Sequence, residues 1–464
     1  MITATEIRKI AKEWNLPEET IEKDYVLGWV LWGIANSQAL NRVWIFRGGT
    51  CIKKCYINTH RYSEDLDFTV LPGGPYRPDE LAAIFNGILP ILNSRSGIDF
   101  GIREPKFELL PYGLSTKGKI YYRGPRLTHT PISIKLDIVA GEQVVRPPVL
   151  CQISHPYSDE LPPENVVYCY NLEEIFAEKI RAMMERSRPR DLYDIVYLYR
   201  RSDLHAEPHL IRLVLEDKCA VKGLQVPVID YFLNSSFQSD VVASWSDMLG
   251  HQLGFLPSHE DFFGELPNFY SWLDGEDTQE LLPSIIQVSA DEAWEPPMVE
   301  WERGQSDLLE PVRFAAVNRL CLNLGYQNKT RHIEPYSLRR TREGNALLYA
   351  LRADNKQTRA YRIDRIQSIL VTNRPFKPTY RIEFSPEGRF SSPLLQQRQR
   401  LSHKSYGKRY SSALPGITYI IQCSYCGKTF RRKKYDLKLN KHKQKDSDWD
   451  CYGTFGYLVD TVYE

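Results

Sequence analysis

Two aspartates, Asp65 and Asp67, alternate with Leu66 and Phe68 in a run that is typical of a β-strand. Successive side chains of a strand point to opposite faces, so the two carboxylates share one face while the apolar residues face a core. Two like charges held side by side are unfavourable unless a cation lies between them. The pattern therefore predicts a sheet that presents a carboxylate pair to a divalent metal ion.

A glycine turn, Gly48-Gly49-Thr50, precedes this strand and follows a short run of β-forming residues over 43–46. Glycine lets backbone N–H groups approach a phosphate closely, and a helix over 51–56 would add the positive end of its dipole. Lys54 in that helix is expected to reach the same phosphates. An ordinary strand–turn–helix, with glycines for geometry only, is the alternative that this segment leaves open.

A second strand is predicted over 132–138, where apolar and polar residues alternate strictly and Asp137 lies on the polar face. On a neighbouring strand, Asp137 would join the first two aspartates. Three carboxylates can hold two Mg²⁺ ions about 3.5–4 Å apart, the arrangement used in phosphoryl and nucleotidyl transfer. A different strand register would bring Asp99 or Glu104 there instead, and solvated surface acids are the plain alternative.

These motifs resemble the nucleotidyltransferase superfamily with the DNA polymerase β fold. More narrowly, they resemble the AbiEii/AbiGii toxins of type IV toxin–antitoxin and abortive-infection systems. The similar segments run in the family's order within residues 1–275: 22–27, 46–50 with Lys54, 61–68, 174–182 and 189–194. The resemblance implies an α+β, multidomain chain with a polymerase-β-type core, helical from about residue 170, that uses Mg²⁺ and an NTP.

The resemblance also implies roles for individual residues. The metal ligands for two Mg²⁺ ions would be Asp65, Asp67 and Asp137. The residues that would hold the nucleotide are Gly48, Gly49, Thr50, Lys54, Arg61 and Ser63. Lys179 would contact the triphosphate, and Asp191 would orient basic groups or the nucleotide. From the residues alone, Lys179 could equally be a surface lysine, and Asp191 could form a helix-start ion pair with Arg190 and Asp194.

The region after residue 305 predicts a small β-barrel or curled sheet. The expected elements are a helix over 311–320 and strands over 330–335, 346–351, 358–362 and 366–372. Residues 334–340 and 362–366 resemble WYL domains, Sm-like barrels that bind ligands or nucleic acid, although Pro335-Tyr336-Ser337-Leu338 replaces the literal Trp-Tyr-Leu. An anion-binding patch, or else a solvated basic face, is expected from Arg339, Arg340, Arg362 and Arg365.

The C-terminal region combines a predicted zinc site with basic residues. Its thiol and imidazole side chains suit a structural, tetrahedral Zn²⁺ and belong to Cys423, Cys426, His442 and Cys451. Eight residues separate the last two, more than in the common finger. Basic and aromatic residues alternate between the ligands, which is typical of nucleic-acid binding, although a solvated basic tail is the alternative. The candidate contacts include Arg431, Arg432, Lys433 and Lys434.

Composition sets only broad limits. The 464 residues favour several domains. We predict a nucleotidyltransferase unit over 1–275, a linker over 276–305, a WYL-like domain over 306–385 and a basic zinc-finger domain over 386–464.

A net charge of +2 excludes neither nucleic acid nor protein as a partner. The nine cysteines, of which only the last three look organised, argue against a disulfide framework. No apolar run is long enough to span a bilayer, so a cytoplasmic protein without membrane contact is expected.

Taken together, the motifs predict a metal-dependent nucleotidyltransferase, and the basic C-terminal region favours a nucleic acid as acceptor. The family resemblance implies a toxin and points to RNA, such as a tRNA 3′ end. Its partners would be RNA and a cognate antitoxin or a phage-defence complex. Two alternatives stay open. The fold could serve as the scaffold of a non-catalytic, nucleic-acid-binding regulator or defence subunit, or the enzyme could nucleotidylylate proteins.

Overall fold

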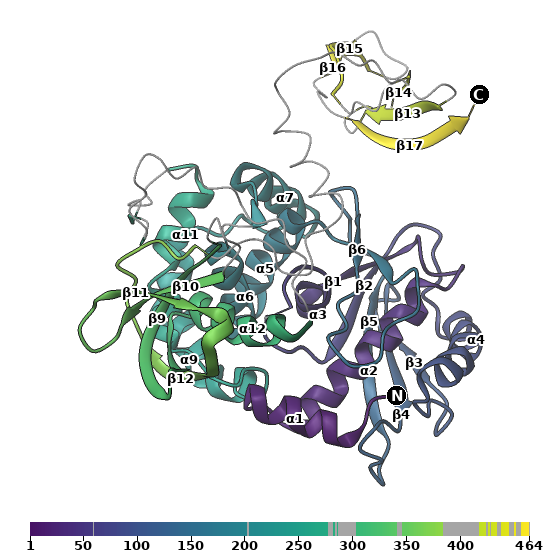
Figure 1. Ribbon diagram of the computed structural model, residues 1–464. Helices are drawn as coiled ribbons and strands as arrows, with labels where there is room; N and C mark the ends of the chain where they lie inside the picture. Colours follow the sequence, from purple (N-terminus) through teal and green to yellow (C-terminus); the bar gives the residue numbers. More distant parts are fainter. Residues whose placement is uncertain are drawn as a thin grey trace. The chain divides into compact units, whose positions relative to one another are not determined.

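The computed structural model describes residues 1–58, 60–201, 204–276, 282–283, 285, 303–340, 346–383, 417–423, 426, 428–433, 438–444, 450–451 and 456–463. Inside helices and strands, it does not describe the side chains of residues 303–308, 310, 339–340, 417–419 and 456–463. The chain forms two compact units, Met1–Gln396 and Gln397–Glu464 (Figure 1). We describe each unit by itself.

A seven-stranded mixed sheet forms the centre of the N-terminal part of the first unit, with the order β3-β4-β5-β2-β1-β7-β6. Its strands are β1 (Trp44–Arg47), β2 (Asp65–Val70), β3 (Lys106–Leu109), β4 (Ser115–Tyr122), β5 (Ile132–Val139), β6 (Val149–Gln152) and β7 (Val166–Cys169). The pairs β2–β5 and β1–β7 are parallel, and the other pairs are antiparallel. The two strands predicted to carry the aspartates are therefore confirmed, and they are neighbours.

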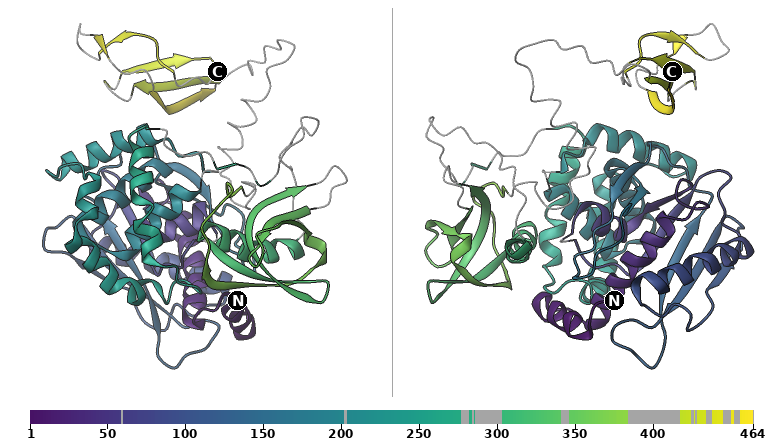
Figure 2. Two further views of the ribbon diagram at one scale, coloured as in Figure 1. Left: turned by 90° about the vertical axis from the view of Figure 1, so that its left-hand side faces the viewer. Right: turned by 45° about the vertical axis from the view of Figure 1, so that its right-hand side comes forward.

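Helices α1 (Ala4–Trp14), α2 (Glu18–Ala35) and α4 (Pro78–Ser96) belong to the same part of the chain. The helices α2 and α4 lie side by side, with α2 against β7 and α4 against β3 (Figures 1 and 2). The close packing of α2 on α4 uses Gly33, because a Cβ there would lie 2.9 Å from the side chain of Leu92. The turn after β1 becomes a short helix, α3 (Gly48–Cys51), that continues as a π-helical turn over Ile52–Tyr56.

The helical part of this unit begins at Leu172, close to the predicted position. It comprises α5 (Leu172–Arg186), α6 (Pro189–Arg200), α7 (Pro208–Val221), α8 (Ile229–Leu233), α9 (Ser235–Leu249), α10 (His259–Phe263) and α11 (Leu266–Leu273). Asn171 caps α5 by accepting a hydrogen bond from the Glu174 backbone, and Pro189 occupies the first turn of α6. In the described ranges, no helix combines the length and apolar character needed to cross a bilayer.

The remainder of the first unit is a helix and a five-stranded antiparallel sheet, ordered β11-β10-β9-β8-β12 (Figure 2). The elements are α12 (Arg303–Val317), β8 (Leu320–Tyr326), β9 (Lys329–Arg340), β10 (Ala346–Arg352), β11 (Thr358–Arg362) and β12 (Ile366–Pro375). The predicted sheet is confirmed, but β8 was missed. It is joined to β9 by Gln327 and Asn328, which both have positive φ, as a two-residue hairpin requires, although the residues are not the usual Asn-Gly.

The second unit contains a three-stranded sheet of β14 (Thr429–Arg432), β13 (Ile417–Cys423) and β17 (Gly456–Tyr463). A separate two-stranded ladder pairs β15 (His442–Lys443) with β16 (Asp450–Cys451). A small buried cluster of Ile421, Leu439 and neighbouring cysteines is its core. A core of this size is too small to stabilise an independent fold by itself. Small domains of this kind are commonly held by a structural metal ion.

Candidate active site

Three carboxylates lie on one face of two parallel strands, which we call the acidic face: Asp65, Asp67 and Asp137. In the register of β2 and β5, Asp67 is directly opposite Asp137. Asp65 lies two residues before Asp67 and so shares its face. The register favours Asp137 over the alternatives, because Asp99 pairs with Arg123 past the far end of β4, and Glu104 precedes β3, two strands beyond β5.

The acidic face is electrostatically strained. Loss of hydration raises the pKa of Asp67 to about 6, and the charges of Asp137 and Asp65 add to the rise while Arg47 opposes it. The pKa of Asp65 is raised by the same loss of hydration, with Lys135 lowering it and Asp137 raising it. Oxygen ligands that repel one another in this way fit a divalent cation such as Mg²⁺.

The glycine turn packs directly against this face. Gly48 has a φ of +82°, and a Cβ on it would lie 2.2 Å from a carboxylate oxygen of Asp67. A Cβ on Gly49 would lie 2.7 Å from the guanidinium of Arg61 and 3.1 Å from the hydroxyl of Ser63. The Thr50 hydroxyl donates to the carbonyl of Asp65 at 2.5 Å, which joins the turn to β2. Geometry therefore requires the two glycines, and it places them beside the acids.

Arg47 and Glu178 form a largely buried ion pair at the edge of the acidic face. Arg47 is opposite Asp67 in the β1–β2 register, and Glu178 comes from α5. Both residues were missed as parts of the site. Their signals in the sequence were the position of Arg47 before the glycine turn and a charged residue, Glu178, between apolar positions of a helix.

A second group of charges, which we call the distal wall, comprises Arg61, Lys179, Arg186, Asp191 and Asp194. Two nitrogens of Arg61 lie 2.7 Å from the two oxygens of Asp194, and those of Arg186 lie 2.8 and 2.9 Å from the oxygens of Asp191. Lys179 bridges both acids, at 2.7 Å from Asp194 and 3.2 Å from Asp191.

Both acids of the distal wall are fully buried, and burial alone would raise their pKa values. Instead, Lys179 and Arg186 lower the pKa of Asp191, and Arg61 and Lys179 hold that of Asp194 well below its usual value. The structure thus brings the predicted residues Lys179, Asp191 and Arg61 together, but as a network of mutual ion pairs.

Lys54 and Arg61, both predicted to hold the nucleotide, are paired with acids inside the fold. Lys54 is 1% exposed and donates to Asp24 of α2 at 2.7 Å, and Arg61 is 2% exposed and forked onto Asp194. Lys54 belongs to the buried residues of the π-helical turn. Both cations are therefore shielded from solvent in this structure. Lys179, 6% exposed, is held in the same way between its two acids.

Two cations that are less buried, Arg186 of the distal wall and Arg190, act electrostatically on the acidic face. The Arg186 side chain is 44% exposed, and its pKa is raised by Asp191 first and then by Asp67 and Glu178. Arg190 is half-buried and lowers the pKa of Asp65. Arg186 was not predicted, although a basic residue in the last turn of α5 is a visible signal. Arg190 was predicted only as a possible ion-pair partner.

A family model, "Nucleotidyl transferase AbiEii toxin, Type IV TA system", matches residues 29–274, which is more than half of the chain and contains all three acids. The chain belongs to the AbiEii family. It is therefore a nucleotidyltransferase of the toxin–antitoxin class, as its motifs predicted. A WYL domain model matches residues 307–371, which confirms the second resemblance.

Solved structures similar to this AbiEii-family chain are distant. MenT4, a nucleotidyltransferase toxin from Mycobacterium tuberculosis, is 16% identical with a TM-score of 0.44, over 60% of this chain and 91% of MenT4. The proteasome accessory factor PafBC of Arthrobacter aurescens is 13% identical with a TM-score of 0.15, over 88% of this chain and 76% of PafBC. No curated protein matches the chain by sequence.

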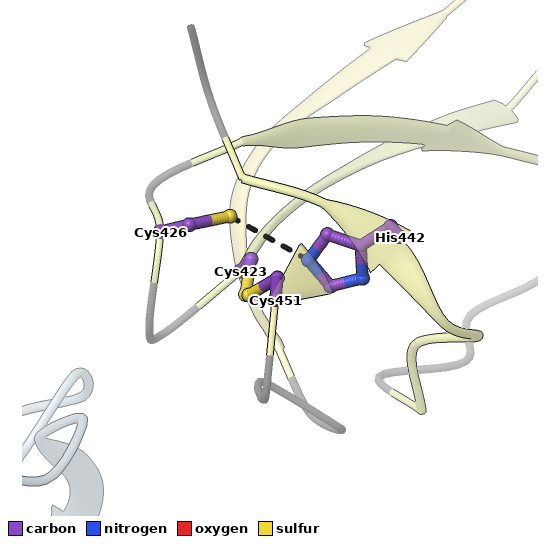
Figure 3. Close-up of side chains that lie close together, drawn as sticks. All are labelled: Cys423, Cys426, His442 and Cys451. Atoms are coloured by element: carbon purple, nitrogen blue, oxygen red, sulfur yellow. Dashed lines mark hydrogen bonds between the residues drawn. The ribbon is translucent and has the colours of Figure 1, made fainter. Parts of the chain in front are cut away.

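The AbiEii-family chain also brings its four predicted zinc ligands together in the second unit (Figure 3). The ligand atoms of Cys423, Cys426, His442 and Cys451 all lie within 4.8 Å of one another. The sulfurs of Cys423 and Cys451 are 3.7 Å apart, and that of Cys426 is 3.5 Å from His442 Nε2. His442 Nδ1 lies 2.8 Å from the Asn440 carbonyl, which leaves Nε2 directed at the thiols, as in metal sites.

The predicted nucleic-acid contacts are described only in part. Arg431 and Lys433 are exposed and Arg432 is half-buried, while Lys434 lies outside the described residues. Arg339 and Arg340 end β9, and their side chains also lie outside the description. In the WYL domain, Arg362 is forked onto Asp364 at 3.0 and 2.7 Å, so an acid balances part of that basic face.

Proposed function

We propose that this AbiEii-family enzyme transfers a nucleotide from an NTP to a hydroxyl group of RNA, the 3′ end of tRNA being the acceptor that the resemblance suggests. The observation that carries the proposal is the acidic face, where Asp67 and Asp137 are opposite each other on parallel strands beside the glycine turn. This arrangement suits metal-assisted nucleotidyl transfer, in which divalent ions would stabilise the charge that develops on the reacting oxygens.

In this reaction the acceptor oxygen forms a bond to the α-phosphorus of the NTP, and the bond from that phosphorus to the bridging oxygen of pyrophosphate breaks. Asp65, Asp67 and Asp137 would hold Mg²⁺, which when bound neutralises triphosphate charge and makes the acceptor hydroxyl more acidic. We assign acceptance of the hydroxyl proton to Asp137, which is half-buried on β5. Pyrophosphate leaves with the electron pair of the broken bond.

The nucleotide's phosphates would lie between the acidic face and the distal wall. Gly48, Gly49 and Thr50 form the floor there, and the open guanidinium groups of Arg186 and Arg190 supply positive charge. Lys179 and Asp191 would hold Arg186 in place, since Asp191 accepts from both. Arg61 and Ser63 would act by supporting Gly49.

RNA is the proposed acceptor because of the second unit. Arg431 and Lys433 are exposed beside the four candidate zinc ligands, and Phe430 lies edge-to-face against His442 with 4.9 Å between ring centres. Basic side chains on a small metal-held fold are typical of nucleic-acid binding. We further propose Zn²⁺ as the metal, a cytoplasmic location, and a cognate antitoxin or defence-complex protein as the partner. We also propose the four-part division of the chain at residues 275, 305 and 385.

The test is incorporation of label from each of the four NTPs, with Mg²⁺, total RNA and the purified full-length chain. We expect label in RNase-sensitive product from one or more NTPs and none from the Asp65→Ala, Asp67→Ala double variant. Asp240→Ala with Asp247→Ala, two exposed acids on α9, is the matched control and should keep activity. Label that is sensitive to protease instead of RNase would replace RNA by protein as acceptor. Transfer that persists in the double variant would refute the proposed site.

A further inference from the structure

Four cysteines converge in the core directly behind the glycine turn, although they are far apart in the sequence. Cys51 ends α3, Cys55 lies in the π-helical turn, Cys151 is on β6 and Cys169 is the last residue of β7. Each is at most 2% exposed. We call this group the core cysteine cluster.

The thiols of this cluster face one another. The sulfurs of Cys51, Cys55 and Cys169 all lie within 4.8 Å of each other. Cys151 interacts with Cys169 as well, and the Cys169 sulfur is 3.9 Å from the Tyr56 hydroxyl. Cys51 and Cys55 are four residues apart, a spacing that places two side chains on the same side of a helix. Cys55 lies in the π-helical turn, a rare form that is frequently found at functional sites.

Packing alone does not require this convergence. Cysteine does serve as a small apolar residue in cores. Cys219 and Cys321 show that use, since each is buried, at 1% and 3% exposed, in a different core region of the first unit. Within the described residues, three or more thiol or imidazole groups come within 4.8 Å of one another at two places, the candidate zinc site of the second unit and the core cysteine cluster. A tetrahedral zinc site with Zn–S bonds of about 2.3 Å holds its sulfurs about 3.8 Å apart. The three sulfurs that lie within 4.8 Å of one another are compatible with that spacing.

We propose that Cys51, Cys55 and Cys169, with Cys151 as the fourth ligand, bind one thiophilic cation of the zinc class. Binding would displace the four thiol protons to solvent and form four metal–thiolate bonds. Since the cluster is closed by burial, the ion would enter while the chain folds and would have a structural role.

The position of the cluster gives this site a consequence for the glycine turn. Cys51 follows Gly48-Gly49-Thr50 directly, and Cys169 is paired with Phe46 in the β1–β7 register. A metal bound there would connect the helix after the turn to the strand beside it. The site would thereby hold both sides of the turn. The inference does not rest on the proposed transfer reaction, because metal content is measured without it.

The experiment is metal analysis by mass spectrometry on the full-length chain, expressed and purified with Zn²⁺ present. We expect about two zinc ions per chain in the wild type, and about one after Cys423→Ser with Cys426→Ser or after Cys51→Ala with Cys55→Ala. All four substitutions together should leave none. The matched control, Cys219→Ala with Cys321→Ala, removes two buried cysteines outside the cluster and should keep about two ions.

A second readout needs no change in the cluster. Refolding the Cys423→Ser, Cys426→Ser variant with Co²⁺ should produce an intense thiolate-to-cobalt absorption band. The proposal is overturned if that variant, folded by circular dichroism, contains no metal and shows no such band. It is equally overturned if the unreduced protein carries a disulfide among the four cysteines instead of a metal.

Discussion

The acidic face and the distal wall both display aspartates, yet their carboxylates are in opposite electrostatic states. Asp67 is only partly buried, and its pKa is raised to about 6. Asp191 and Asp194 are completely buried, and their pKa values are lowered. Burial alone would give the reverse order.

The difference lies in the partners. The distal wall matches its two acids with ion pairs to Arg61, Lys179 and Arg186. On the acidic face, the neighbouring Arg47 is already paired by Glu178, and Lys135 and Arg190 act on Asp65 without cancelling the rise in its pKa. Acids that a protein balances internally hold its structure, and acids that it leaves unbalanced are suited to an external cation. Substitutions at the two places should therefore separate loss of transfer from loss of stability.

The largest expected effect is that of Asp67→Asn on nucleotide transfer. The amide cannot replace a carboxylate as a metal ligand of this kind, so we expect transfer to fall at least about 10⁴-fold, or roughly 5 kcal/mol. The same change removes a carboxylate whose charge is unfavourable in the fold, so thermal stability should be equal or higher. Transfer rate and melting temperature of one preparation check both parts. A clear loss of stability would show that the charge of Asp67 stabilises the fold, as the charges of the distal-wall acids do, and would contradict the prediction.

Asp194→Asn should have the opposite signature. It leaves the buried charge of Arg61 without its acid and Lys179 with Asp191 alone, so the free energy of unfolding should fall by about 3–5 kcal/mol. Urea denaturation measures it, with the exposed Asp240→Asn as the matched control that should change little. A stable Asp194→Asn protein would show that the distal wall is not held by its charges.

The third expected effect is a pH dependence of opposite sign at the two places. The folded pKa of Asp67 is above its ordinary value of 3.8, so its ionisation costs stability as pH rises from about 4 to about 6. In buffer without divalent ions, the advantage of Asp67→Asn over wild type should be near zero below pH 4. It should then grow to a plateau of about 3 kcal/mol, which is reached above about pH 7, where the carboxyl is ionised in the folded and the unfolded state alike.

At the distal wall the sign is reversed, because the folded pKa of Asp194 lies well below 3.8. Its contribution to stability is complete above its unfolded pKa and is lost only as pH falls through the lower folded value. The deficit of Asp194→Asn relative to wild type should therefore be unchanged between pH 5 and 7. A deficit that shrinks across this window would contradict the pairing.

The smallest effect concerns an uncharged neighbour of the distal wall. The buried Tyr193 hydroxyl donates to Asn318 at 3.0 Å, which joins α6 to the residue after α12. Tyr193→Phe keeps the ring but leaves Asn318 short of one donor, so a loss of about 1 kcal/mol in unfolding free energy is expected, with transfer unchanged. A loss as large as that of Asp194→Asn would show that the wall depends on this hydrogen bond as much as on its ion pairs.

Local sequence patterns were sufficient to predict several strands and the candidate zinc site. Strand alternation predicted β2 and β5 and the faces of their aspartates, because side-chain direction in a strand depends only on position along it. The types and order of Cys423, Cys426, His442 and Cys451 likewise predicted a site that the fold brings together. The strand β8 was missed because its hairpin residues carry no typical turn signal.

Only the tertiary structure decided which charges meet. Lys54 pairs with Asp24, 30 residues away, and Arg61 with Asp194, 133 residues away, so both cations are internal ion-pair partners in this structure. The convergence of Cys51 and Cys169 also depends on the pairing of β1 with β7. The sequence by itself determined which residues carry chemistry and on which face, because periodicity is local. Contacts between distant segments decided which side chains are buried and which charges pair. Those contacts distinguish the acids of the acidic face, which are suited to bind a cation, from the acids of the distal wall, which stabilise the fold.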